Sequence, residues 1–249
     1  EDPILVVLGQ DRRERFFLLG LLTGLLEQPG EAALEATVGH GCHLVEARGH
    51  HGDADLLAQG VIDDGTTRAR ETGDTAYYAE AWSATERALE IDPGHLEARK
   101  MQVWILLGQH EFPRAVEAAE AINKKVPDDV LTYGFLVDGY TELGRYADAE
   151  KAAQWMLDIR PGNVPALTRA AHLRELFGDH EGAVEHARRC IDVCAANDAP
   201  PIERFFGYVV LAIAQSRAGD RAAYLTARQR ALDQYALVAP DERQWCKAD

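Results

Sequence analysis

Residues 130–161, VLTYGFLVDGYTELGRYADAEKAAQWMLDIRP, contain two helical patterns separated by a glycine. Tyr133, Leu136 and Tyr140 are spaced by three and four residues, which places them on one face of a first helix. Gly144 marks a turn, and beyond it an inward-facing stripe continues on a second helix at Tyr146, Ala149, Ala153, Met156 and Ile159. The final proline ends that helix, because proline cannot continue the helical hydrogen-bond ladder. The stretch therefore predicts a pair of helices joined by a tight turn.

The same pattern recurs at a fixed interval of 34 residues. Three kinds of residue keep this period: prolines at Pro93, Pro127 and Pro161; alanines at Ala81, Ala115, Ala149 and Ala183; and aromatic residues at Tyr78, Phe112 and Tyr146, with His180 in the next position. Three columns that share one period predict a repeat architecture, in which each helix pair buries its apolar face against its neighbours.

A 34-residue helix-turn-helix unit is typical of tetratricopeptide repeats, and residues 130–161 resemble that family closely. The resemblance covers roughly residues 53–235 and is specific between residues 77 and 193. It implies an all-α fold, a right-handed α-solenoid of antiparallel helix pairs that forms a superhelix. The alanine column would lie where paired helices cross, and the aromatic column would fill the gap between one pair and the next.

The period also predicts how the chain is divided. We expect an N-terminal helical cap or leader segment at 1–52, a solenoid at 53–237 and a tail at 238–249. The best repeats are at 62–95, 96–129, 130–163 and 164–197, and a C-terminal capping pair is at 201–236.

In tetratricopeptide proteins the first helices of successive pairs line a concave groove that binds extended or helical peptides. The register of the resemblance places six candidate partner-binding residues in this groove: Lys100, Trp104, Asp138, Thr141, His172 and Glu175. Trp104 is the leading anchor, because an exposed tryptophan on a concave surface is a frequent hot spot; the alternative is that it packs on its neighbours. The resemblance thus implies a non-catalytic interaction module or scaffold.

The charge balance bounds the class of partner. Acidic residues outnumber basic ones by 41 to 26, which gives a formal net charge of -15. Such a chain repels nucleic-acid phosphates, so we expect a neutral or basic protein or peptide as partner and no nucleic acid. The sequence contains no GxSxG, P-loop, HExxH or dinucleotide-binding motif. We therefore predict that the chain is not an enzyme and needs no cofactor.

A dense group of histidines and a cysteine offers one alternative function. Metal-competent side chains crowd together at His40, Cys42, His43, His50 and His51. Their spacing matches no zinc finger and no covalent haem motif, so we predict a polar loop rather than a metal site. The alternative is a metal- or cofactor-binding accessory protein that uses residues 40–53.

The apolar run at residues 16–26, FFLLGLLTGLL, follows three arginines and resembles part of a signal peptide. It is too short to span a bilayer, so no membrane span is predicted, and a buried helix is the competing interpretation. Its apolar face also makes self-assembly into a homo-oligomer an alternative. The sequence favours a cytoplasmic location and leaves an exported form open.

Overall fold

The computed structural model describes residues 76–238, which form α-helices joined by short turns, with no strand in that range. The helices are α5 (Ala76–Ile91), α6 (Leu96–Gly108), α7 (Phe112–Asn123), α8 (Val130–Glu142), α9 (Tyr146–Ile159), α10 (Val164–Leu176), α11 (His180–Ala196), α12 (Pro201–Arg217) and α13 (Arg221–Leu237). The described residues do not include the predicted 1–52 segment, the His40–His51 cluster, the 16–26 run or most of the predicted tail.

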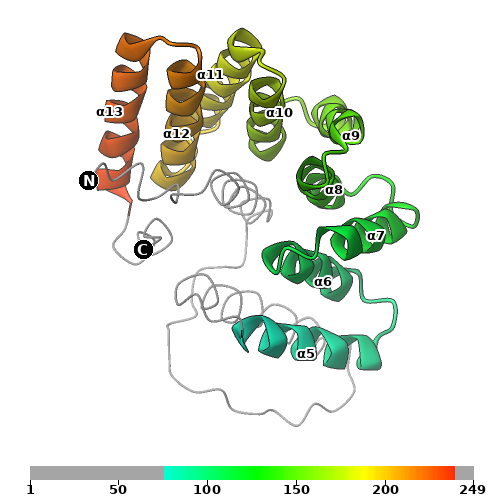
Figure 1. The fold of residues 1–249 in the computed structure, drawn as a ribbon. Helices are drawn as coiled ribbons and strands as arrows, with labels where there is room; N and C mark the ends of the chain where they lie inside the picture. Colours follow the sequence, from blue (N-terminus) through cyan, green and yellow to red (C-terminus); the bar gives the residue numbers. More distant parts are fainter. Residues whose placement is uncertain (1–75, 239–249) are drawn as a thin grey trace.

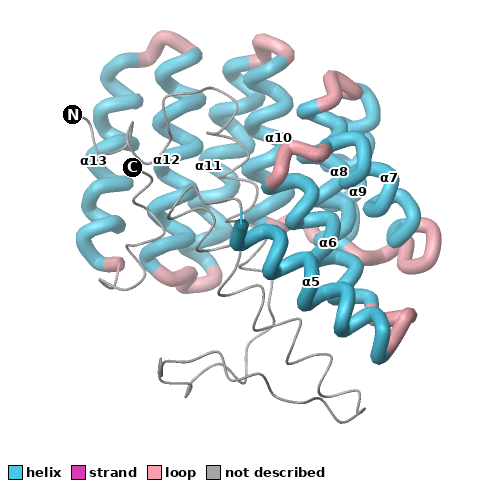
Figure 2. The backbone as a smooth tube through the Cα atoms, turned by 60° about the horizontal axis from the view of Figure 1, so that its bottom comes forward, coloured by secondary structure: helices cyan, strands magenta, loops and turns pink. Residues whose placement is uncertain are grey.

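The helices follow one another along a curved path, with α6, α8 and α10 on the inner side and α7, α9 and α11 on the outer side (Figure 1). The turns that connect them lie at two opposite edges of the array (Figure 2). Each helix packs on the next one along the chain, and the inner helices also contact one another. The predicted all-α solenoid of antiparallel helix pairs is confirmed.

Polar side chains fix where the inner helices begin. The residue before each helix accepts a hydrogen bond from a backbone N–H three residues later, which satisfies a group that the helix itself leaves without a partner. The inner helices α6, α8 and α10 are capped in this way by His95 Nδ1, Asp129 Oδ2 and Asn163 Oδ1. Asp179 and Asp220 cap α11 and α13 in the same manner.

The alanine column lies in the core, as predicted. Ala81, Ala115 and Ala183 are each 1% exposed and Ala149 is fully buried. A methyl group lets two helix backbones approach closely, whereas a longer side chain would push them apart and disturb a close-packed interior. The 34-residue alanine period therefore places a small buried residue on each of α5, α7, α9 and α11.

The aromatic column and the α9 stripe differ from the prediction. Tyr78 is buried and Phe112 packs partly buried against the core, in agreement with the prediction, whereas Tyr146 is 41% exposed. It begins α9 at the edge of the array, where its ring packs edge to face against the ring of Phe177. The two ring centroids are 6.1 Å apart. Ile159, at the other end of α9, is 39% exposed, so the inward stripe contains only the alanines and Met156.

The turns between paired helices need one residue with positive φ. Gly144, Gly178 and Gly219 fill this position with φ of 71°, 78° and 78°. In the α6–α7 turn the position belongs to His110, with φ of 61°. The glycine of that repeat comes two residues earlier, because a Cβ on Gly108 would lie 2.7 Å from the Tyr78 hydroxyl. Close approach of Tyr78, rather than backbone conformation, thus accounts for the displaced glycine.

This assignment predicts opposite effects of substitutions at equivalent positions of two repeats. His110→Gly should stabilise the protein by roughly 0.5–1 kcal/mol, because a left-handed backbone strains any side chain with a Cβ. Gly144→Ala should destabilise it by about 1 kcal/mol through strain alone, since nothing lies within 4 Å of the new methyl group. Urea unfolding monitored by circular dichroism measures both changes, and a lower midpoint for His110→Gly would contradict the account.

Candidate functional site

The six predicted residues all lie on inner helices. Lys100 and Trp104 belong to α6, Asp138 and Thr141 belong to α8, and His172 and Glu175 belong to α10. Their side chains are less open to a partner than the groove model requires, because most of them are engaged with neighbouring helices.

Trp104 is buried, so the prediction of an exposed tryptophan anchor is wrong. Its exposed fraction is 5%, and it belongs to the same apolar cluster as Phe135 and Leu136 of α8. An indole ring buries a large apolar area, and packing between adjacent repeats uses that area here. Trp104 therefore supports the inner face from within the core.

Lys100 is also buried and connects two repeats. Its Nζ lies 2.8 Å from Glu97 Oε1 and 3.1 Å from Asp129 Oδ1, while Asp129 also caps α8. Burial alone would lower the pKa of Lys100, but the hydrogen bond to Glu97 and the two nearby carboxylates outweigh it and raise the pKa. Lys100 therefore remains charged and holds α6 to the start of α8.

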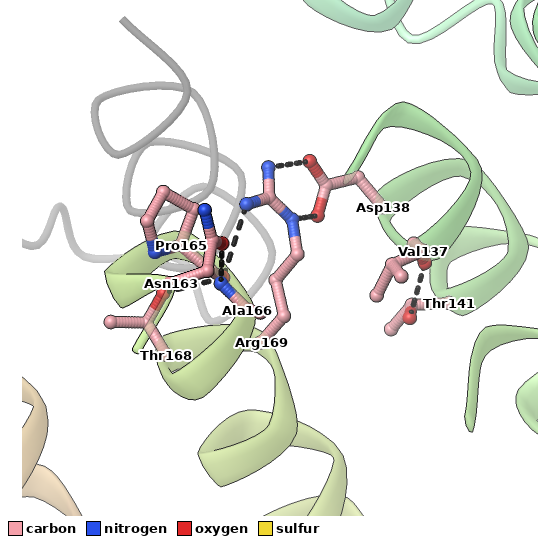
Figure 3. A network of polar contacts seen from close by, with 8 residues as sticks. All are labelled: Val137, Asp138, Thr141, Asn163, Pro165, Ala166, Thr168 and Arg169. Carbon is pink, nitrogen blue, oxygen red and sulfur yellow. Dashed lines mark hydrogen bonds and ion pairs between the residues drawn. The ribbon is translucent and has the colours of Figure 1, made fainter. Parts of the chain in front are cut away.

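Asp138 pairs with Arg169, a residue that sequence reasoning missed. Arg169 Nε donates to Asp138 Oδ1 at 2.9 Å and Nη2 donates to Oδ2 at 2.8 Å, so the contact is bidentate (Figure 3). The two side chains are 5% and 14% exposed, and Arg169 Nη1 also donates to the Pro165 carbonyl at 3.2 Å. A Cβ on Gly134 would lie 3.3 Å from the guanidinium carbon, so this glycine makes room for the pair.

A third ion pair continues the pattern. Arg217 Nε lies 3.0 Å from Glu175 Oε1 and links α12 to α10. We use the term inner ion pairs for Lys100–Asp129, Asp138–Arg169 and Glu175–Arg217. They join α6 to α8, α8 to α10 and α10 to α12, so each charged residue predicted to contact a partner is engaged between neighbouring repeats.

His172 and Glu175 are the two predicted residues that the structure brings together at an opening. With Thr168 on α10 and Val210 and Ile213 on α12, they line a pocket of about 10 Å³ between these inner helices, which has room for roughly one water molecule. Burial lowers the pKa of His172 to about 4, so its imidazole is neutral at pH 7. The pocket thus combines apolar walls, a neutral imidazole and a carboxylate that already has a cationic neighbour.

Thr141 lies apart from this pocket. Its hydroxyl donates to the Val137 carbonyl at 2.7 Å within α8 (Figure 3). Within residues 76–238, no three His, Cys, Asp or Glu side chains are grouped as a metal site would require. Over the same residues, no helix is both long and apolar enough to cross a membrane.

The Asp138–Arg169 contact predicts a large, asymmetric effect of mutation. Arg169→Met should cost roughly 3–5 kcal/mol, because it leaves the Asp138 carboxylate buried without a cation. The double variant Asp138→Leu/Arg169→Met should recover most of that loss, since no charge remains to be desolvated. Denaturant unfolding of both single variants and the double variant measures the coupling. A double variant as unstable as the sum of the singles would show that the pair is not coupled.

The lowered pKa of His172 predicts a loss of stability in acid. The pKa of His172 in the folded state lies below its unfolded value of 6.5. The stability of the fold that depends on neutral His172 is therefore fully present above pH 6.5 and is lost as the pH falls toward 4. A shift from 6.5 to about 4 corresponds to an effect on the order of 3 kcal/mol. His172→Leu should reduce the loss between pH 7 and pH 4 by that amount, as measured by urea unfolding at each pH. Equal pH profiles for the two proteins would contradict the assignment.

Comparison with known proteins finds likeness only at the level of structure. No family model and no curated protein matches the chain. The crystal structure of TTC0263, a thermophilic tetratricopeptide-repeat protein of Thermus thermophilus, is 17% identical with a TM-score of 0.61, over 80% of this chain and 98% of that chain. A crystal structure of MamA is 16% identical with a TM-score of 0.50, over 68% and 93% of the two chains. Residues 76–238 therefore have the tetratricopeptide-repeat fold that the 34-residue period predicts.

Proposed function

We propose that this chain is a non-catalytic interaction module that binds a protein or peptide on the inner face of its solenoid. The observation that supports the proposal is the inner face itself: all six predicted residues lie on α6, α8 and α10, which pack side by side along the inner side of the array (Figure 1). Solenoids of stacked helix pairs use their extended concave surfaces in this way, because successive repeats contribute side chains to one continuous face.

Within this face, the proposed contact region is the part formed by α10 and α12. His172 and Glu175 lie there beside Val210 and Ile213, so a partner side chain would meet apolar surface flanked by two polar groups. Thr141 would extend the region toward α8. Lys100 and Asp138 would act indirectly, by holding the inner helices in place through the inner ion pairs.

The proposed partner is neutral or basic. The chain carries a formal net charge of -15, which attracts cationic protein surfaces and repels nucleic-acid phosphates. His172 is neutral at pH 7 and adds no positive charge to the pocket. Glu175 already pairs with Arg217, so an approaching basic side chain would share the Glu175 carboxylate with Arg217.

Site-specific photocrosslinking tests the proposed surface. A photoreactive phenylalanine analogue at Ile213 should form an adduct with a defined protein in native cells, because Ile213 lines the inner pocket. The matched control carries the analogue at Gln154, an exposed residue of the outer helix α9. The proposal predicts an adduct from Ile213 alone. The same adduct from Gln154 alone, or from neither position, would contradict it.

Affinity measurements on the crosslinked partner then test the residues. His172→Ala should weaken binding about tenfold or more, because a central contact in a binding site commonly contributes at least 1.4 kcal/mol. Gln154→Ala should leave affinity unchanged. Isothermal titration calorimetry gives both values, and circular dichroism confirms that the variants are folded. Unchanged affinity for His172→Ala would remove this residue from the proposed site.

A further inference from the structure

A second cleft lies at one edge of the array and shares no residue with the inner pocket. It is formed where the α9–α10 loop meets the end of α11 and the start of α12, and its volume is about 450 Å³. Volumes of this order are typical of small-molecule sites. None of the six predicted partner-binding residues lines this cleft, so its ligand must be inferred from its walls.

Most of the lining is apolar. Val164 and Pro165 come from the start of α10, Val193 from the end of α11, and Ala199 from the loop before α12. The thiol-bearing Cys194 adds a wall residue that is 1% exposed. A ligand that fills this cleft would therefore bury an aliphatic segment against these side chains.

One acidic residue stands among these apolar walls. Glu203, in the first turn of α12, lines the cleft and is partly buried. Burial raises the pKa of its carboxyl group, because a charged carboxylate is poorly solvated there. Among the described residues, no ion pair joins Glu203 to a cation. A cation placed beside this carboxylate would favour its charged form, which burial disfavours.

The nearby arginines of this chain form no ion pair with Glu203. Arg204 is adjacent in sequence, but its Nη2 lies 2.6 Å from Asp198 Oδ1 on the exposed side. Arg160 lines the cleft from the α9–α10 loop, where it is exposed, and it forms no ion pair within residues 76–238. Arg160 would compete with an incoming cation, so its removal should favour the ligand.

The position of Glu203 at the start of α12 also affects its charge. An acidic residue in the first turn interacts favourably with the positive end of the helix dipole. Glu181 has the same kind of position in α11, but it is exposed and lines neither cleft. Glu181 is therefore the matched control that separates the role in the helix from the role in the cleft.

We propose that this cleft binds a primary ammonium group on an aliphatic chain, with the ammonium on the Glu203 carboxylate and the methylene groups along Val164 and Val193. A lysine side chain of a partner protein and a free aliphatic diamine both carry this chemistry. The proposal does not depend on the function proposed for the inner face, because the two sites lie on different residues.

Nuclear magnetic resonance titration of the ¹⁵N-labelled full chain tests the proposal. The probes are Nα-acetyl-lysine methylamide, cadaverine and, as the uncharged control, Nα-acetyl-norleucine methylamide. We expect at least one ammonium probe to shift the amide signals of Val193, Ala199 and Glu203 saturably, with little response to the norleucine probe. Binding of the lysine probe alone would identify a partner's lysine as the source, and binding of cadaverine alone would identify a free amine.

Three variants make the result specific. Glu203→Gln should weaken the ammonium probe at least tenfold, Arg160→Ala should leave binding equal or tighter, and Glu181→Gln should leave it unchanged. Circular dichroism checks that each variant is folded. The proposal is overturned if neither ammonium probe gives saturable shifts, if norleucine binds equally well, or if Glu203→Gln and Glu181→Gln have the same effect.

Discussion

The structure depends on the close approach of paired helices at alanines spaced by 34 residues. Ala81, Ala115, Ala149 and Ala183 are at most 1% exposed, and a longer side chain at any of these positions would push neighbouring helices apart. A helix pair made in this way is thin, so its remaining apolar surface must be covered by the next pair. Stacking of successive pairs produces the continuous inner face of the array (Figure 1).

The inner face is where structural and binding roles compete for the same side chains. Lys100, Asp138 and Glu175 occupy positions from which a groove would contact a peptide, yet each forms an ion pair with a neighbouring inner helix. The Asp138–Arg169 contact is the most buried of these, and buried pairs are little screened by salt. A chain with a net charge of -15 thus places cations at its inner face, where they join repeats to one another.

The sequence was sufficient to predict the fold because the period repeats the same packing problem several times. Interactions that occur once were not predictable in the same way. Trp104 has the register of a groove residue, but its burial depends on how two inner helices pack. Arg169 and Asp138 are 31 residues apart, a separation that carries no signal until the pitch of the array is known. Gly108 is displaced from its turn by contact with Tyr78, a residue of the preceding helix. The six site residues remain proposals for partner contact.

Hydrogen–deuterium exchange of the full chain, resolved by mass spectrometry, tests most directly whether the inner ion pairs hold successive repeats together. The comparison is between wild type and Arg169→Met, with Arg114→Met as a control at an exposed residue of the outer helix α7. The account predicts faster exchange in α8 and α10 of the Arg169 variant, with the control unchanged, because the link between two helix pairs is broken. Unchanged protection in α8 and α10 would show that apolar packing alone joins the repeats and would contradict the role given to these ion pairs.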